Sequence, residues 1–145
     1  MKSIILSNYS FFDKDYIKTF SYQDKYKFFS VYDITGFLGS FYLGKLREIL
    51  GNKVEGTFKD FALSKEQTEQ IKNVFEEQID QNLPLIEPVE GRRYKSLTFE
   101  WKGKSYDMNL SLISPKSRNI QDFYKIVTIA KECLSENKPM YLSIE

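Results

Sequence analysis

The sequence has no histidine and only one cysteine, Cys133, among its 145 residues. Without imidazole, the chain has no histidine general base, no Ser-His or Cys-His catalytic pair and no histidine metal ligand. One cysteine excludes an internal disulfide and a zinc site built from several thiolates of this chain. We therefore expect a protein that holds no metal, uses no cofactor and is not an enzyme.

Long apolar runs are also missing. The longest uncharged apolar run, residues 34–44, is too short to span a bilayer. After Leu6 polar residues return, so the start of the chain lacks the apolar core of a signal peptide. Together with the single cysteine, these absences predict a cytoplasmic protein that does not contact a membrane.

A strong net charge is absent as well, since the formal charge at pH 7 is +1. Such a balance provides little overall attraction to nucleic acid or to an anionic membrane. The charge is unevenly distributed, however: residues 60–90 carry eight acidic side chains and two lysines, a local charge of −6. This segment is the strongest electrostatic feature of the sequence.

The clearest structural pattern lies in residues 94–113, which predict a β-hairpin. Apolar residues alternate with polar ones along both arms, as expected for strands with one buried face. The turn is Lys102-Gly103, and a glycine at a positive φ angle suits a tight hairpin. With that turn, Phe99 faces Tyr106. The other predicted facing pairs are Leu97 with Met108 and Thr98 with Asp107.

Two helices are predicted in the second half of the chain. Ser64 and Gln67 form a capping box before a helix over residues 65–82. Its buried stripe comprises Ile71, Val74, Phe75 and Ile79. A second helix is predicted from an Asn119 cap to about residue 137, buried across the sheet, and Cys133 lies on it as a small apolar residue.

The remaining elements complete a single α+β domain over residues 1–145. Strands are predicted at 2–7, 24–33 and 54–62 and after Pro139, and a helix at 37–50, while residues 9–20 fit either a strand or a helix. The expected order is β-β-α-β-α-β-β-α-β. The expected architecture is a mainly antiparallel sheet of about five strands packed against three helices.

Residues 39–45 match the first seven positions of a P-loop, G-x-x-x-x-G-K. Leu46 stands where that motif needs a Ser or Thr hydroxyl for magnesium, and the loop interior is Phe-Tyr-Leu. We therefore interpret Gly39 and Gly44 as positions where a helix approaches its neighbours closely.

Two small groups of polar residues are candidates for chemistry. Glu100 and Asp107 lie on the polar face of the hairpin, where paired carboxylates can act as acid and base. Arg92 and Arg93 precede the hairpin and can bind a phosphate or carboxylate. Together they support an alternative function as a small ligand-binding domain or a carboxylate-based enzyme, against the simpler interpretation of a solvated sheet face and loop.

Residues 9–32 combine ten aromatic side chains with four lysines. This composition is typical of surfaces on which single-stranded bases stack. Three aspartates nearly cancel the lysines, so nucleic-acid binding is a further alternative and packing in the core is the preferred interpretation.

The outer face of the helix at 65–82 carries the acidic side chains Glu66, Glu69, Glu76, Glu77 and Asp80. Such a face either keeps the protein soluble or attracts a basic partner. The second interpretation leads to our main functional hypothesis. It describes a non-catalytic protein-binding domain, specifically a bacterial immunity or antitoxin-like protein that neutralises a cognate toxin, with a basic toxin domain as partner.

Overall fold

The computed structural model describes residues 3–10, 28–32, 37–51, 54, 58–85, 96–109 and 115–144. These residues form an α+β fold, as the sequence predicts. Its elements are β1 (Ser3–Ser7), β2 (Phe28–Tyr32), α2 (Phe37–Leu50), β3 (Phe58–Ala62), α3 (Lys65–Asn82), the 3-10 turn η3 (Leu83–Leu85), β4 (Ser96–Trp101), β5 (Lys104–Asn109), α4 (Pro115–Ser135) and β6 (Tyr141–Ile144). Among the described residues, the predicted order of strands and helices is confirmed.

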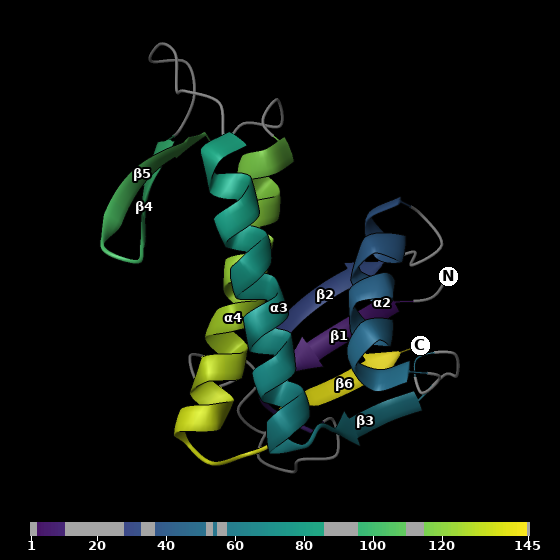
Figure 1. Cartoon of the computed structure of the whole chain (residues 1–145). Coiled ribbons are helices and arrows are strands. Elements are labelled where there is room, and N and C mark those ends of the chain that lie inside the picture. Colours follow the sequence, from purple (N-terminus) through teal and green to yellow (C-terminus); the bar gives the residue numbers. More distant parts are fainter. Residues whose placement is uncertain are drawn as a thin grey trace, which may run out of the picture.

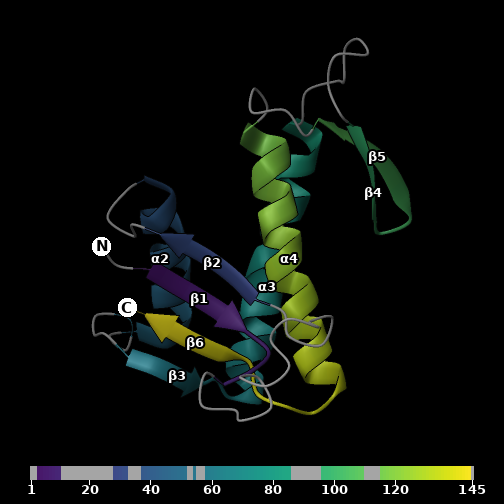
Figure 2. The same ribbon diagram turned by 180° about the vertical axis from the view of Figure 1, so that it is seen from behind.

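The strands form two separate sheets. Four of the described strands make an antiparallel sheet in the order β2-β1-β6-β3, and the other two, β4 and β5, pair with each other. Figures 1 and 2 show the β4–β5 hairpin beside α3 and α4, away from the larger sheet. The predicted sheet of about five strands is thus a four-stranded sheet plus a detached hairpin.

The two central strands of the larger sheet supply its buried rows. Ile4 pairs with Ile144, and Leu6 pairs with Leu142 on one side and Phe29 on the other. All five side chains are less than 5% exposed. Since alternate residues of a strand share one face, these rows form the floor of the core.

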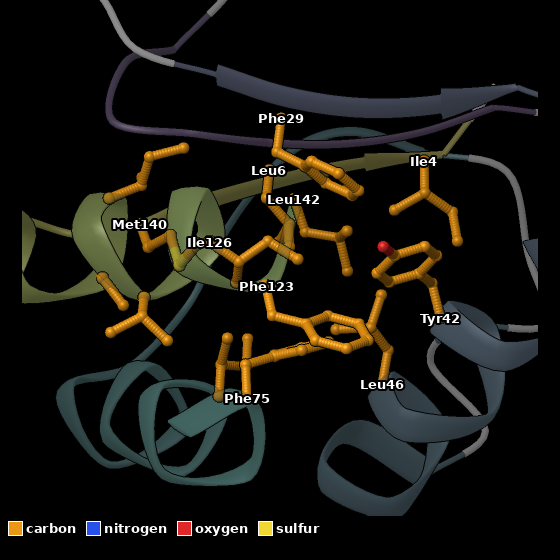
Figure 3. Packing of buried hydrophobic residues seen from close by; sticks show 14 of the residues in the cluster. Ile4, Leu6, Phe29, Tyr42, Leu46, Phe75, Phe123, Ile126, Met140 and Leu142 are labelled. Atoms are coloured by element: carbon orange, nitrogen blue, oxygen red, sulfur yellow. The ribbon is translucent and has the colours of Figure 1, made fainter. Parts of the chain in front are cut away.

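Aromatic rings from α2, α3, α4 and β2 meet above this floor (Figure 3). The ring of Tyr42 lies 5.0 Å from Phe29, 6.0 Å from Phe75 and 6.1 Å from Phe123. Burial raises the pKa of the Tyr42 hydroxyl above its ordinary value. The aromatic cluster therefore joins three helices to the sheet.

The P-loop-like segment lies wholly within α2, so its glycines are helical rather than part of a phosphate-binding loop. Leu46, which stands at the magnesium position of the motif, is 1% exposed in the core. The interpretation of a close approach is wrong at Gly44, because a Cβ there would meet no atom within 4 Å.

Helix α3 follows its sequence signals closely. The Ser64 Oγ accepts a hydrogen bond from the backbone N–H of Gln67 at 3.1 Å. In return, the Gln67 Oε1 accepts one from the backbone N–H of Ser64 at 2.9 Å, so the capping box is confirmed. Ile71, Phe75 and Ile79 are fully buried at helical spacing, and Val74 is half-buried beside them.

Helix α4 differs from its prediction at the N-terminus and in its packing. It begins at Pro115 rather than after Asn119, because proline is well suited to the first helical position. It lies mainly along α3 (Figures 1 and 2) and touches β2, whereas the sequence predicted a helix across the sheet. Cys133 is fully buried on it, as predicted.

The hairpin has the predicted register, with Phe99 opposite Tyr106, Leu97 opposite Met108 and Thr98 opposite Asp107. Lys102 and Gly103 have φ angles of 51° and 81°. Two consecutive positive φ angles define a type I′ turn, whose twist matches that of the strands.

Candidate functional site

The five predicted partner-binding residues form one acidic face on α3, which we define as Glu66, Glu69, Glu76, Glu77 and Asp80. Four of them are exposed, and Glu76 is half-buried. Glu66, Glu69, Glu77 and Asp80 follow a spacing of 3, 8 and 3 residues, which keeps them on one side of the helix, opposite the buried stripe.

Lysines from three elements reach this acidic face. The Lys72 Nζ lies 3.9 Å from Glu69 and 3.8 Å from Glu76, while the Lys131 Nζ from α4 lies 3.6 Å from Glu76. The Lys102 Nζ from the hairpin turn lies 2.7 Å from Asp80. Three of the five carboxylates are therefore paired with lysines, and the local negative field is much weaker than the charge of residues 60–90 suggests.

Two carboxylates of the acidic face are not paired with a lysine in the described part of the chain. Glu77 accepts a hydrogen bond from the Gln81 amide at 3.2 Å, and Glu66 forms no ion pair there. Both are exposed. With Glu69, whose side chain is 51% exposed, they form the part of the face that is open to a partner.

Asp80 has a structural role that the sequence analysis missed. Its two oxygens accept from the Trp101 Nε1 and the Lys102 Nζ, each at 2.7 Å. The Lys102 hydrogen bond, followed by that from Trp101, lowers the pKa of this carboxyl below its ordinary value. The sequence carries a hint of this role. Asp80 lies in the last turn of the predicted helix, where the negative end of the helix dipole repels a carboxylate, so a compensating partner is expected there.

Trp101 holds the hairpin against the two helices and is 7% exposed. Its ring lies 6.2 Å from that of Tyr124 on α4, and Phe99 packs edge-on against the same tyrosine at 4.9 Å. The Lys102 and Lys131 ammonium groups lie 5.7 and 5.6 Å from the centre of the Trp101 ring. We call Asp80, Phe99, Trp101 and Tyr124 the hairpin anchor.

The alternative site built from two carboxylates and two arginines is described only in part. Glu100 is exposed and lies opposite Ser105 in the hairpin, so it faces solvent. Asp107 lies opposite Thr98 in the backbone ladder, and its side chain is outside the described residues. Arg92 and Arg93 also lie outside them.

The aromatic stretch at 9–32 falls mostly outside the described residues. Of its described members, Tyr9 and Phe29 are buried in the core, which fits the preferred interpretation of core packing. Phe28 is 42% exposed, with the Lys125 Nζ lying 5.6 Å from the centre of its ring. One ring of the stretch is therefore exposed beside a lysine.

A cavity of about 190 Å³ lies between the start of α3 and the end of α4. Its lining comprises Leu63, Lys65, Thr68, Cys133, Leu134, Asn137, Lys138 and Pro139. Burial raises the pKa of the Cys133 thiol to about 11. The thiol is therefore protonated at neutral pH and is a poor nucleophile.

The described residues contain no group of three or more acidic or cysteine side chains that could hold a metal ion. Among the described helices, none has the length and apolar character needed to cross a bilayer.

Comparison with protein-family models, with curated proteins and with solved structures found no match. The function must therefore be inferred from the residues of this chain. Of the predicted sites, the acidic face of α3 is the one whose side chains are all described.

Proposed function

We propose that this chain is a non-catalytic protein-binding domain that covers part of a partner with the outer side of α3. Within that class we propose a cytoplasmic, bacterial immunity or antitoxin-like protein, whose partner is a toxin with a basic surface. The observation that carries the proposal is the row of exposed carboxylates Glu66, Glu69 and Glu77 on one side of a firmly held helix.

The rigidity of α3 supports this function. The capping box ends the helix cleanly at its N-terminus, while Ile71, Phe75 and Ile79 are 0% exposed on the opposite side. Helix α4 packs along the same length. A preorganised row of carboxylates loses little conformational entropy on binding, because its backbone is already ordered.

The lysines that pair with the acidic face determine how strongly this face attracts a basic partner. Because Lys72, Lys102 and Lys131 compensate Glu69, Glu76 and Asp80, long-range steering comes mainly from Glu66 and Glu77. The compensated pairs still supply directional contacts once a partner excludes water. We expect specificity from the whole face and a moderate electrostatic effect on the association rate.

The test begins with copurification from the native source, followed by association kinetics with the partner obtained. A variant with Glu66→Lys and Glu77→Lys removes the two carboxylates that have no lysine partner in the described residues. The matched control changes Glu48 and Glu136 to Lys, since these carboxylates are 61% and 51% exposed and lie outside α3.

We expect the α3 variant to slow association roughly tenfold at low salt and to flatten its salt dependence, while the control has little effect. An unchanged association rate in the α3 variant would exclude this face. Protection of host cells by coexpression with the toxic partner then tests the immunity function, and a bound partner whose activity persists would refute it.

The exposed Phe28 ring supports a second candidate, binding of single-stranded nucleic acid. A titration with a labelled single-stranded oligonucleotide at two salt concentrations tests it, with Phe28→Ala as the variant. Affinity that falls with salt and drops about fivefold or more on removal of the ring supports stacking, whereas no binding at low salt excludes it.

A further inference from the structure

The β4–β5 hairpin has two outer edges that no described strand covers. A two-residue type I′ turn closes on a hydrogen-bonded pair, here Trp101 and Lys104. Because hydrogen-bonded and non-hydrogen-bonded pairs alternate, Phe99 and Tyr106 are also a bonded pair. The backbone groups of Ser105, Asp107 and Asn109 on β5 therefore point away from β4.

Burial identifies β5 as the outer strand. Phe99 and Tyr106 face each other on the side of the hairpin that meets the helices, yet Phe99 is 6% exposed and Tyr106 is only half-buried. The anchor residues Phe99 and Trp101 both belong to β4. Lys104 and Ser105 on β5 are exposed, so the outward edge of β5 is accessible to another chain at its end next to the turn.

This edge lacks two of the usual protections against strand pairing, a proline and a β-bulge. The six pairs from Ser96–Asn109 to Trp101–Lys104 are continuous, and neither strand contains a proline or a bulge. By contrast, β3 at the edge of the larger sheet has a register shift between Phe58 and Phe61.

We propose that the outer edge of β5 binds an extended segment of a partner protein as a third strand. This inference needs the protein partner of the proposed function but not the acidic face of α3. Main-chain hydrogen bonds to Ser105, Asp107 and Asn109 provide the affinity, and side chains on the incoming strand provide the selectivity.

The side chains of β5 define the incoming segment. Lys104 and Tyr106 are two residues apart and lie on one face of β5. The residues of an incoming strand that lie beside them would therefore also be two positions apart. Lys104 is exposed and forms no ion pair within the described residues. The segment therefore carries an acidic residue beside Lys104 and, two positions away, an apolar residue that packs against Tyr106.

The probe is a library of displayed 12-residue peptides, selected on the full chain and followed by anisotropy measurements with labelled synthetic peptides. Ser105→Pro removes one outward N–H without removing a donor from the β4–β5 ladder, and Ser105→Ala is the matched control. Trp101, the only tryptophan, reports by its emission whether the hairpin remains docked in each variant.

We expect the selected peptides to carry an acidic and an apolar residue two positions apart. Compared with the unchanged chain, Ser105→Pro should bind them at least tenfold more weakly, and Ser105→Ala should bind them within twofold. A peptide N-methylated at alternate amides should lose binding to the unchanged chain, so the test holds even if the proline variant unfolds.

Three results would overturn the proposal: no enriched peptides, equal binding by a folded proline variant, or a dimer of this chain that Ser105→Pro dissociates. The Glu66→Lys, Glu77→Lys variant should bind these peptides normally, which separates failure of this site from failure of the acidic face.

Discussion

Substitution of Asp80 tests how the hairpin is held against the helices, because the Asp80 carboxylate makes the polar contacts of the hairpin anchor. Asp80→Ala removes both 2.7 Å hydrogen bonds, whereas Asp80→Asn keeps an acceptor for the Trp101 Nε1 and removes the ion pair with Lys102. The two variants therefore separate the hydrogen bond to tryptophan from the charge interaction.

The expected magnitude follows from these contacts. The hydrogen bond to Trp101 contributes about 1 kcal/mol. The exposed ion pair contributes less than this hydrogen bond, because solvent screens it. Removing a carboxylate from the last turn of α3 returns roughly 0.3 kcal/mol through the helix dipole. We expect Asp80→Ala to lower the free energy of unfolding by about 1 kcal/mol and Asp80→Asn by less than half of that.

Denaturant unfolding followed by Trp101 fluorescence measures both variants, and hydrogen exchange of the β4 and β5 amides measures hairpin docking directly. Glu77→Gln is the control, since Glu77 is exposed on α3 and its hydrogen bond within the described residues comes from Gln81 rather than from the hairpin. Equal losses in Asp80→Asn and Asp80→Ala, or unchanged exchange in both, would refute the role of the Trp101 hydrogen bond.

The same contact predicts a pH dependence. The pKa of Asp80 is lower in the folded chain than its ordinary value of 3.8. Its stabilisation is therefore present above pH 3.8 and is lost as the pH falls through the lower folded pKa. Trp101 emission should change over that acid range in the unchanged chain and stay flat in Asp80→Asn.

Two further predictions concern the glycines of α2 and of the hairpin turn, and the cysteine of α4. Gly44→Ala should raise the free energy of unfolding by about 0.5–1 kcal/mol, because a Cβ there meets no atom within 4 Å. In contrast, Gly103→Ala should lower it by about 1 kcal/mol, since the φ angle is 81°; denaturant unfolding of both measures the pair. Alkylation of Cys133 at pH 8.5 should require unfolding, because the thiol is buried with a pKa of about 11; rapid alkylation without denaturant, measured by mass spectrometry, would contradict this.

The features that were predicted correctly from the sequence arise from contacts between residues a few positions apart. The capping box joins Ser64 to Gln67, and the hairpin register follows from the turn at Lys102-Gly103. The start of α4 was predicted too late, because Asn119 is also a good N-cap residue, whereas the helix begins at Pro115.

The net charge of the acidic face depends on residues that are distant in the sequence. Residues 60–90 carry a charge of −6, yet Lys102 and Lys131, which lie outside that segment, pair with Asp80 and Glu76. Only folding places these lysines there. A charge count along the sequence therefore overstates the field that a partner meets.

Local patterns predicted most helices and strands and the hairpin register, because alternation, caps and turns act over a few residues. Long-range packing is what keeps the hairpin apart from the larger sheet and docks it on α3 and α4 through Trp101. Its hydrogen bond to Asp80 spans 21 positions. Contacts of that separation form only when the helices and the hairpin have packed, so no local pattern encodes them.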